Sequence, residues 1–280
     1  TKVLIWLAEH TVRDKPGEEQ DLSMPVLDER LLTSPAVAIQ QAQNAVEKMA
    51  ARAARNYRAA MPLLAGYKDD AAAVVNQRED LIDRMEVTLT NYLIKISDRE
   101  LGEMESHRAN SLLAFVTEVE RIGDYAINVT ERAAEMRDKE LTFSDQAQRE
   151  LQMLGDAIGE IIDLTVQAMH SGDAATAAQV EPLEETVDTI CETLRTRHIQ
   201  RLKDGKCQLE SGIIFLDVLT NLERISDHCS NIAARLLGME SDSELDPHAL
   251  KKAMHNGNTK GYDDALNQYR KKYSQVLAEG

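Results

Sequence analysis

The feature that most constrains the fold of this chain is a short phrase that occurs twice. Glu-Arg-Ile-x-Asp-x-x-x-Asn begins at Glu120 and again at Glu223, which is 223 − 120 = 103 residues later. In both copies the Glu, Asp and Asn fall at i, i+4 and i+8, the spacing that aligns side chains along one side of an α-helix. The repetition predicts an internally duplicated unit that contains this helix.

An apolar periodicity of 3.6 residues predicts long helices from about Ser34 onward. Ser34 followed by Pro35 is typical of a helix start, and Pro182 is expected to mark a restart or kink. With only 4% aromatic residues, the composition also favours helices over sheets. The expected helices span roughly residues 35–62, 70–98, 103–137, 144–171, 173–204, 210–238 and 263–277.

Long helices with short connections suit antiparallel bundles. We therefore predict an all-α fold of two tandem three-helix bundles, with a short C-terminal helical tail. The expected divisions are a leading segment and linker (1–30), a first repeat (31–138), a second repeat (139–238) and the tail (239–280).

A second duplicated element lies on the helix that precedes each copy of the phrase. Glu79-x-x-x-Asp83 is matched by Glu184-x-x-x-Asp188, at an offset of 105 residues. Each repeat therefore offers two carboxylate pairs on neighbouring helices. Carboxylate and amide oxygens favour hard cations such as iron(III), manganese(II), magnesium or calcium, and zinc is also compatible. The candidate ligands are Glu79, Asp83, Glu120, Asp124, Glu184, Asp188, Glu223 and Asp227, with Asn128 and Asn231 as auxiliary ligands.

A solvated helix face explains the same letters without any metal, because Glu and Asp at i, i+4 are common in a chain that is 29% charged. Arg121 and Arg224, within the duplicated phrase, are compatible with salt bridges to these carboxylates. The residues alone leave both readings open. Recurrence at matching positions, beside an apolar stripe, is the argument for the metal.

Other chemistry is poorly represented. A net charge of −16 disfavours nucleic acid and anionic lipid as partners. The chain has no H-E-x-x-H, Walker or G-x-S-x-G motif, so we predict no catalytic residues and no enzyme. His228 is expected to pack, and His198 to lie at the surface. The basic cluster of residues 195–206 is expected to complement a helix dipole, with an anion or phospholipid contact as the alternative.

With Glu-x-x-x-Asp on the preceding helices, the doubled phrase resembles the PhoU family of phosphate-signalling proteins, which are built from two tandem three-helix bundles. The junction at residues 27–36 is similar to the segment before the PhoU-like C-terminal domain of bacterial Na/Pi cotransporter family proteins. Lys271-Lys272-Tyr273 is similar to the tail of that group. The resemblance covers residues 27–277.

The resemblance implies that the eight carboxylates named above are the family's metal-cluster positions. It implies a multinuclear metal such as iron, zinc or manganese, with phosphate as a candidate further ligand. This chain departs from the family pattern at Tyr125, where His is common, and at Ser226, where Gly is common.

The resemblance further implies a regulatory domain of a sodium-dependent phosphate transporter, on the cytoplasmic face of the bacterial inner membrane. Its partner would be the transporter's own transmembrane domain, and the apolar run at residues 3–8 would end a membrane-proximal helix. A homodimer is left open. The alternatives are a stand-alone PhoU-like adaptor, a carboxylate-bridged metalloenzyme and a metal-free helical scaffold.

Overall fold

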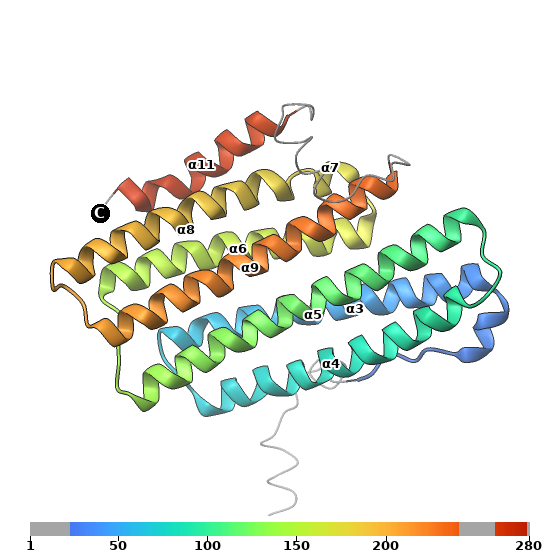
Figure 1. Ribbon diagram of the computed structural model, residues 1–280, viewed down its shortest axis with the longest axis horizontal. Helices are drawn as coiled ribbons and strands as arrows, with labels where there is room; N and C mark the ends of the chain where they lie inside the picture. The colour runs from blue at the N-terminus through green and yellow to red at the C-terminus, as the bar shows by residue number, and fades with distance from the viewer. Residues whose placement is uncertain (1–22, 241–260, 279–280) are drawn as a thin grey trace, which may run out of the picture.

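The computed structural model describes residues 23–240 and 261–278, and throughout these residues all regular structure is helical (Figure 1). The predicted membrane-proximal run at residues 3–8 lies outside the described residues. None of the described helices is long and apolar enough to cross a membrane. The elements are η1 (Glu29–Thr33), α3 (Pro35–Ala60), η2 (Met61–Leu64), α4 (Asp69–Ser97), α5 (Glu103–Asp138), α6 (Asp145–Ser171), α7 (Ala174–Ala177), α8 (Val180–Lys203), α9 (Leu209–Glu240) and α11 (Tyr262–Ala278).

The helix ends follow local chemistry. Pro35 opens α3, where its missing N–H leaves no bond unmade. The Ser144 hydroxyl caps α6 by accepting a hydrogen bond from the backbone N–H of Ala147. Gly172 ends α6 with a φ of 65°, a left-handed conformation that glycine adopts without strain.

One predicted helix is divided in two. The segment expected to be helical over 173–204 contains the short α7, a break at residues 178–179, and then α8. Pro182 lies in the first turn of α8, where a residue without an N–H donor costs nothing. The restart expected at Pro182 therefore begins two residues earlier, at Val180.

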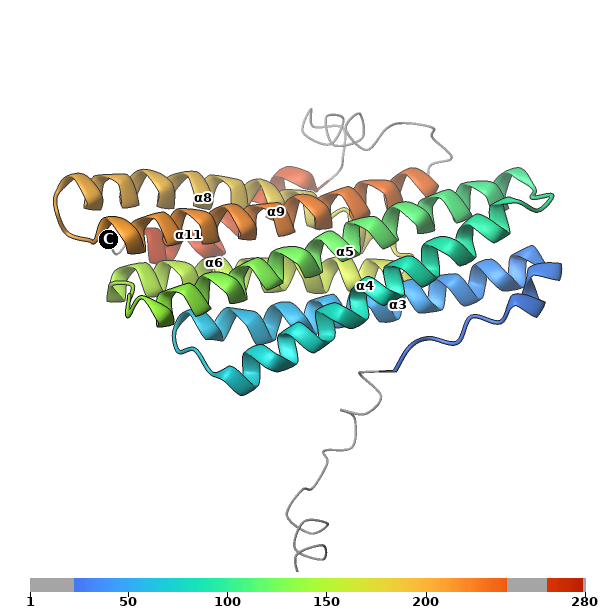
Figure 2. The same ribbon diagram turned by 60° about the horizontal axis from the view of Figure 1, so that its bottom comes forward.

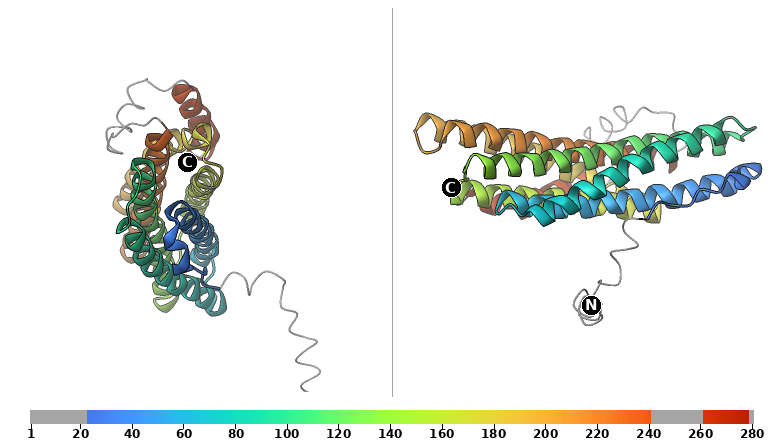
Figure 3. Two further views of the ribbon diagram at one scale, coloured as in Figure 1. Left: turned by 90° about the vertical axis from the view of Figure 1, so that its right-hand side faces the viewer. Right: turned by 90° about the horizontal axis from the view of Figure 1, so that it is seen from below.

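The helices form two layers. Helices α4, α5, α9 and α8 pack side by side in that order, and α3, α6 and α11 form the second layer behind them (Figures 2 and 3). The first bundle is α3, α4 and α5, and the second is α6, α8 and α9. They meet where α5 packs on α9 and where α3 packs on α6.

The α5–α9 interface has approximate two-fold symmetry: a contact from a residue of α9 to a residue of α5 recurs between the equivalent residues with the two helices interchanged. The Asn231 amide donates to Oε2 of Glu118 at 3.2 Å, and the Asn128 amide donates to Oδ1 of Asn221 at 3.4 Å. The offsets 231 − 128 and 221 − 118 are both 103, so these two contacts are the same contact made twice.

His228 and Tyr125, another pair at an offset of 103, stack on each other at this interface with ring centroids 5.6 Å apart. Nδ1 of His228 also lies 2.6 Å from Oε2 of Glu118. Burial raises the pKa of Glu118, but the hydrogen bonds from His228 and Asn231 outweigh it and leave the pKa lowered. His228 therefore packs, as predicted, and also orders a carboxylate.

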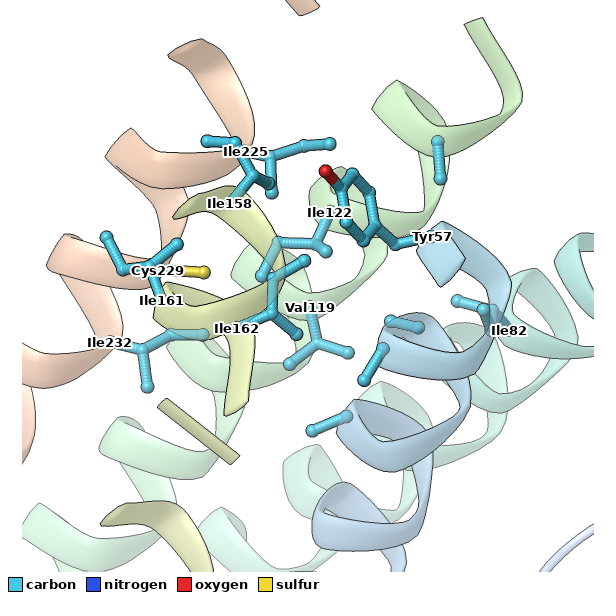
Figure 4. Packing of buried hydrophobic residues seen from close by; sticks show 14 of the residues in the cluster. Tyr57, Ile82, Val119, Ile122, Ile158, Ile161, Ile162, Ile225, Cys229 and Ile232 are labelled. Atoms are coloured by element: carbon cyan, nitrogen blue, oxygen red, sulfur yellow. The ribbon is translucent and has the colours of Figure 1, made fainter. Parts of the chain in front are cut away.

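A continuous hydrophobic core joins the bundles. Ile122 of α5, Ile158 and Ile162 of α6, and Ile225 of α9 are all nearly inaccessible and gather in one cluster (Figure 4). Burying side chains of this size contributes about 1.5–3 kcal/mol each. The two repeats are thus held together by apolar packing as well as by the polar contacts between α5 and α9.

Candidate metal centres

The structure gathers two equivalent groups of carboxylates, one in each repeat. Glu79 and Asp83 of α4 meet Asp124 of α5, and in the second repeat Glu184 and Asp188 of α8 meet Asp227 of α9. In each group the ligand oxygens all lie within 4.8 Å of one another. We call the first group site 1 and the second group site 2.

This spacing fits a hard cation. Two oxygens on opposite sides of an ion with bonds of about 2.0–2.4 Å lie about 4–5 Å apart. Three carboxylates that converge so closely without a cation repel one another, and the repulsion is strongest where they are shielded from water. The donor set and its spacing therefore fit manganese, iron, magnesium or calcium.

Glu79 is the buried member of site 1, with only 8% of its surface exposed. Its Oε2 accepts a hydrogen bond of 3.3 Å from the amide of Asn56, a fully buried residue of α3. Its Oε1 is buried and has no hydrogen-bond partner among the described residues. Buried carboxylate oxygens are normally paired, so an unpartnered oxygen on a member of this acidic group fits a metal ligand.

The site raises the pKa values of its acids. Burial, followed by the charges of Asp83, Asp124 and Glu120, raises the pKa of Glu79 to about 8. Burial and Asp124 raise the pKa of Glu120 to about 7, and burial and Asp124 also raise the pKa of Asp83. A proton or a cation is therefore needed at neutral pH to offset the crowded charge.

Gly123 gives the Glu79 carboxylate its place against α5. A Cβ at this position would lie 2.9 Å from Oε2 and 3.0 Å from Oε1 of Glu79, closer than real Cβ atoms approach. Glycine in mid-helix costs about 0.5–1 kcal/mol relative to alanine. The close approach of the Glu79 carboxylate, which a larger residue would block, explains why glycine fits here. The equivalent residue of site 2 is Ser226, whose hydroxyl donates to the backbone carbonyl of Glu223 at 3.1 Å.

The two sites differ in their counter-charges. Arg121 and Arg224 make matching contacts, each 3.2 Å from the carboxylate of Asp124 or Asp227. Next to site 2, Arg195 of α8 forms a two-pronged ion pair with Glu223, which lies one turn before Asp227. Glu120, the corresponding neighbour of site 1, lies 3.6 Å from Arg121 of its own helix.

Six of the eight predicted carboxylates thus fall in the two groups. Glu120 and Glu223 lie one turn earlier on α5 and α9 and are not members of these groups. Asn128 and Asn231, predicted as auxiliary ligands, use their amides across the α5–α9 interface.

Sequence reasoning missed the burial of His198. It is 3% exposed and stacks on Phe215, with centroids 4.5 Å apart, so the expected surface position is wrong. The neighbouring basic cluster meets Glu150 of α6, which is 2% exposed and accepts two hydrogen bonds from Arg201. No local pattern marks Glu150, because its partner lies 51 residues away.

Comparison with known proteins supports the reading of two repeats. The sequence model of the PhoU domain matches residues 46–133 and 151–236, one stretch on each side of the α5–α6 connection. The chain belongs to the PhoU domain family. A phosphate-specific transport system accessory protein PhoU homolog of Thermotoga maritima is 20% identical over 201 residues, which cover 71% of this chain and 86% of that protein.

A longer relative also matches. A putative inorganic phosphate export protein, YjbB, of Salmonella typhimurium is 21% identical over 238 residues, which cover 83% of this chain but only 43% of that protein. Among solved structures, PhoU from Pseudomonas aeruginosa superposes with a TM-score of 0.68 at 21% identity, over 76% of this chain and all of that one. The all-α fold of tandem bundles is thereby confirmed.

Proposed function

We propose that this chain is a PhoU-like regulatory protein of phosphate transport whose two carboxylate sites bind hard cations. The pair of matching carboxylate groups carries the proposal, because the same three side chains converge in both repeats. The curated PhoU relatives favour a stand-alone accessory protein over a domain fused to a carrier. It would act beside a transporter on the cytoplasmic face of the membrane and perform no chemistry of its own.

In this proposal Glu79, Asp83 and Asp124 would hold one ion or a small cluster, and Glu184, Asp188 and Asp227 another. When bound, the ion supplies positive charge that offsets the repulsion among the carboxylates. Each site joins the two helices of a hairpin, α4 with α5 or α8 with α9. Because α5 and α9 pack on each other, a shift in either hairpin reaches the contact between bundles and can bias a two-state regulator.

The first test is elemental analysis of protein purified without added metal or chelator. We expect at least one equivalent of iron, zinc or manganese, reduced by Asp124→Ala or Asp227→Ala and lost when both are combined. Glu131→Ala, an exposed carboxylate of α5 outside both groups, is the matched control. Protein that is metal-free and takes up none of these ions on addition would refute the metal part.

The regulatory part has a separate test in cells that lack the gene. Phosphate uptake should return to its normal control when the wild-type chain is supplied, but not when the double Asp124→Ala/Asp227→Ala variant is supplied at equal abundance. Uptake that is the same with and without the wild-type chain would contradict a role in phosphate transport, whatever the metal content.

One observation favours a second candidate, a regulatory domain of a longer sodium-dependent phosphate transporter. The match to the export protein covers 83% of this chain while using 43% of that protein, as expected if the shared part is a domain. The gene sequence upstream of the codon for residue 1 decides between the candidates. Several apolar spans of about 20 residues would favour the transporter domain, and their absence would favour the stand-alone protein.

A further inference from the structure

The layer opposite the two carboxylate sites carries a large open groove. Its volume is about 930 Å³, and its lining residues come from α3, η2 and the following Ala65, α6 and α11, with none from the four helices that hold sites 1 and 2. α6 forms the floor, with α3 on one side and α11 on the other (Figure 3, left). The groove is therefore separate from the carboxylate sites in both position and composition.

The groove has the length and shape of a helix-binding site. It follows α6 from Gln152 to Gln167, and fifteen residues at 1.5 Å each span about 22 Å. The space above Gly159 is open, because a Cβ there would meet only the Tyr57 ring, at 3.9 Å. Helices pack with their axes about 8–10 Å apart, so a trough along α6 that is flanked by two further helices is suited to one more.

The chemistry of the lining indicates what kind of helix fits. Apolar side chains, including Met61, Pro62, Met153 and Leu164, offer a surface for an apolar face. Along the same side of α6 run three carboxylates at one-turn spacing, Asp156, Glu160 and Asp163. A helix with one apolar face and a row of basic residues matches both features.

The charges in the groove are unevenly balanced. Arg58 pairs with Asp163, and Lys272 lies 2.7 Å from Glu160, which also accepts the Tyr273 hydroxyl. Asp156 is exposed, and among the described residues its hydrogen-bond donor is the neutral amide of Gln152, at 2.9 Å. Three carboxylates against two cations leave an excess of negative charge, in a chain whose net charge is already −16. Complementary charge speeds association and orients the partner.

We propose that this groove binds a basic amphipathic helix of a partner protein, whose apolar face lies over Gly159 and whose basic side chains meet Asp156, Glu160 and Asp163. The molecule would then bind cations in the layer of α4, α5, α9 and α8, and a partner helix on the layer of α3, α6 and α11.

The test uses a fluorescent 16-residue Leu/Ala/Lys peptide with Lys at i, i+4 and i+7, and a twin with Glu in place of Lys. Binding to the full chain is followed by fluorescence anisotropy at about 0.15 M salt, where long-range attraction is screened. We expect the Lys peptide to bind and the Glu twin not to. Gly159→Leu, which fills the groove, should weaken binding at least about tenfold, equivalent to about 1.4 kcal/mol.

Asp156→Lys provides a second variant that does not depend on filling the groove, and it should weaken the Lys peptide several-fold. Glu131→Lys makes the same charge change on α5, outside the groove, and should leave the affinity close to that of the wild type. If Asp156→Lys and Glu131→Lys lose the same affinity for the Lys peptide, binding reflects the overall negative charge of the protein and the proposal is overturned. Equal affinity of Gly159→Leu and the wild type would also overturn it, because the peptide would then not occupy the groove. A wild-type dimer that Gly159→Leu converts to a monomer would assign the groove to a second copy instead, which would also overturn it.

Discussion

Glu79→Gln should stabilise the metal-free protein in a pH-dependent way. The folded protein raises the pKa of Glu79 from 4.5 to about 8, so the fold favours the protonated acid. The contribution of this group to stability is fully present below about pH 4.5 and is lost as the pH rises through about 8. Gln mimics the protonated acid at every pH and avoids that loss.

The size of the effect follows from linkage. A shift from 4.5 to about 8, at 1.36 kcal/mol for each pKa unit, corresponds to about 5 kcal/mol above pH 8. At about pH 7 the same relation gives about 3 kcal/mol, and at about pH 5 less than about 1 kcal/mol. Because Glu120 titrates beside it, a measured gain of about 2–5 kcal/mol at about pH 9 would agree with this reasoning.

The assay is urea unfolding followed by circular dichroism, in chelator, at about pH 5, 7 and 9. The free energy of unfolding of Glu79→Gln is compared with that of the wild type, and exposed Glu131→Gln should show no trend with pH. A difference between Glu79→Gln and wild type that stays constant across this range would refute the reasoning. In a parallel series without chelator, added manganese should stabilise the wild type more than Glu79→Gln, since a ligand stabilises only the form that binds it.

Three further substitutions test individual contacts. Gly123→Ala should weaken cation binding at site 1 by about tenfold, equivalent to about 1.4 kcal/mol, because its Cβ displaces the Glu79 carboxylate; isothermal titration with manganese would detect this, and unchanged affinity would contradict it. Tyr57→Phe removes a buried hydrogen bond of 2.8 Å to the Gly155 carbonyl and should cost about 1–2 kcal/mol of stability in urea unfolding. Glu150→Gln leaves Arg201 without its buried carboxylate and should cost about 3–5 kcal/mol, measured by the same unfolding experiment; a loss below about 1 kcal/mol would show that the pair contributes little.

The helices and the carboxylate groups were largely predictable, because both depend on short-range spacing. A Glu-x-x-x-Asp pair on α4 or α8 lies on one face, so packing that helix against α5 or α9 brings its pair to the matching Asp. The distance of Glu120 and Glu223 from these groups depends on how far each helix is shifted along its neighbour, which local spacing does not fix. One helical turn corresponds to about 5.4 Å along the helix axis.

Features that depend on helices distant in the sequence were not predictable from local patterns. His198 is buried because α8 turns that face towards Phe215 of α9 and Glu150 of α6. The groove beside α11 forms only when α3, α6 and α11 pack together, so no local sequence pattern predicts it. Arg195 pairs with Glu223 rather than with solvent because α8 and α9 are neighbours.

The two-fold contact between α5 and α9 has a consequence for how such a protein can change. In a homodimer with this interface, one substitution would alter both symmetric contacts at once. Here both halves belong to one chain, so Glu118–Asn231 can carry a charge while its counterpart, Asn221–Asn128, stays neutral. Substitutions can therefore change the stability or the pH dependence of one of these two contacts while the other contact stays as it is.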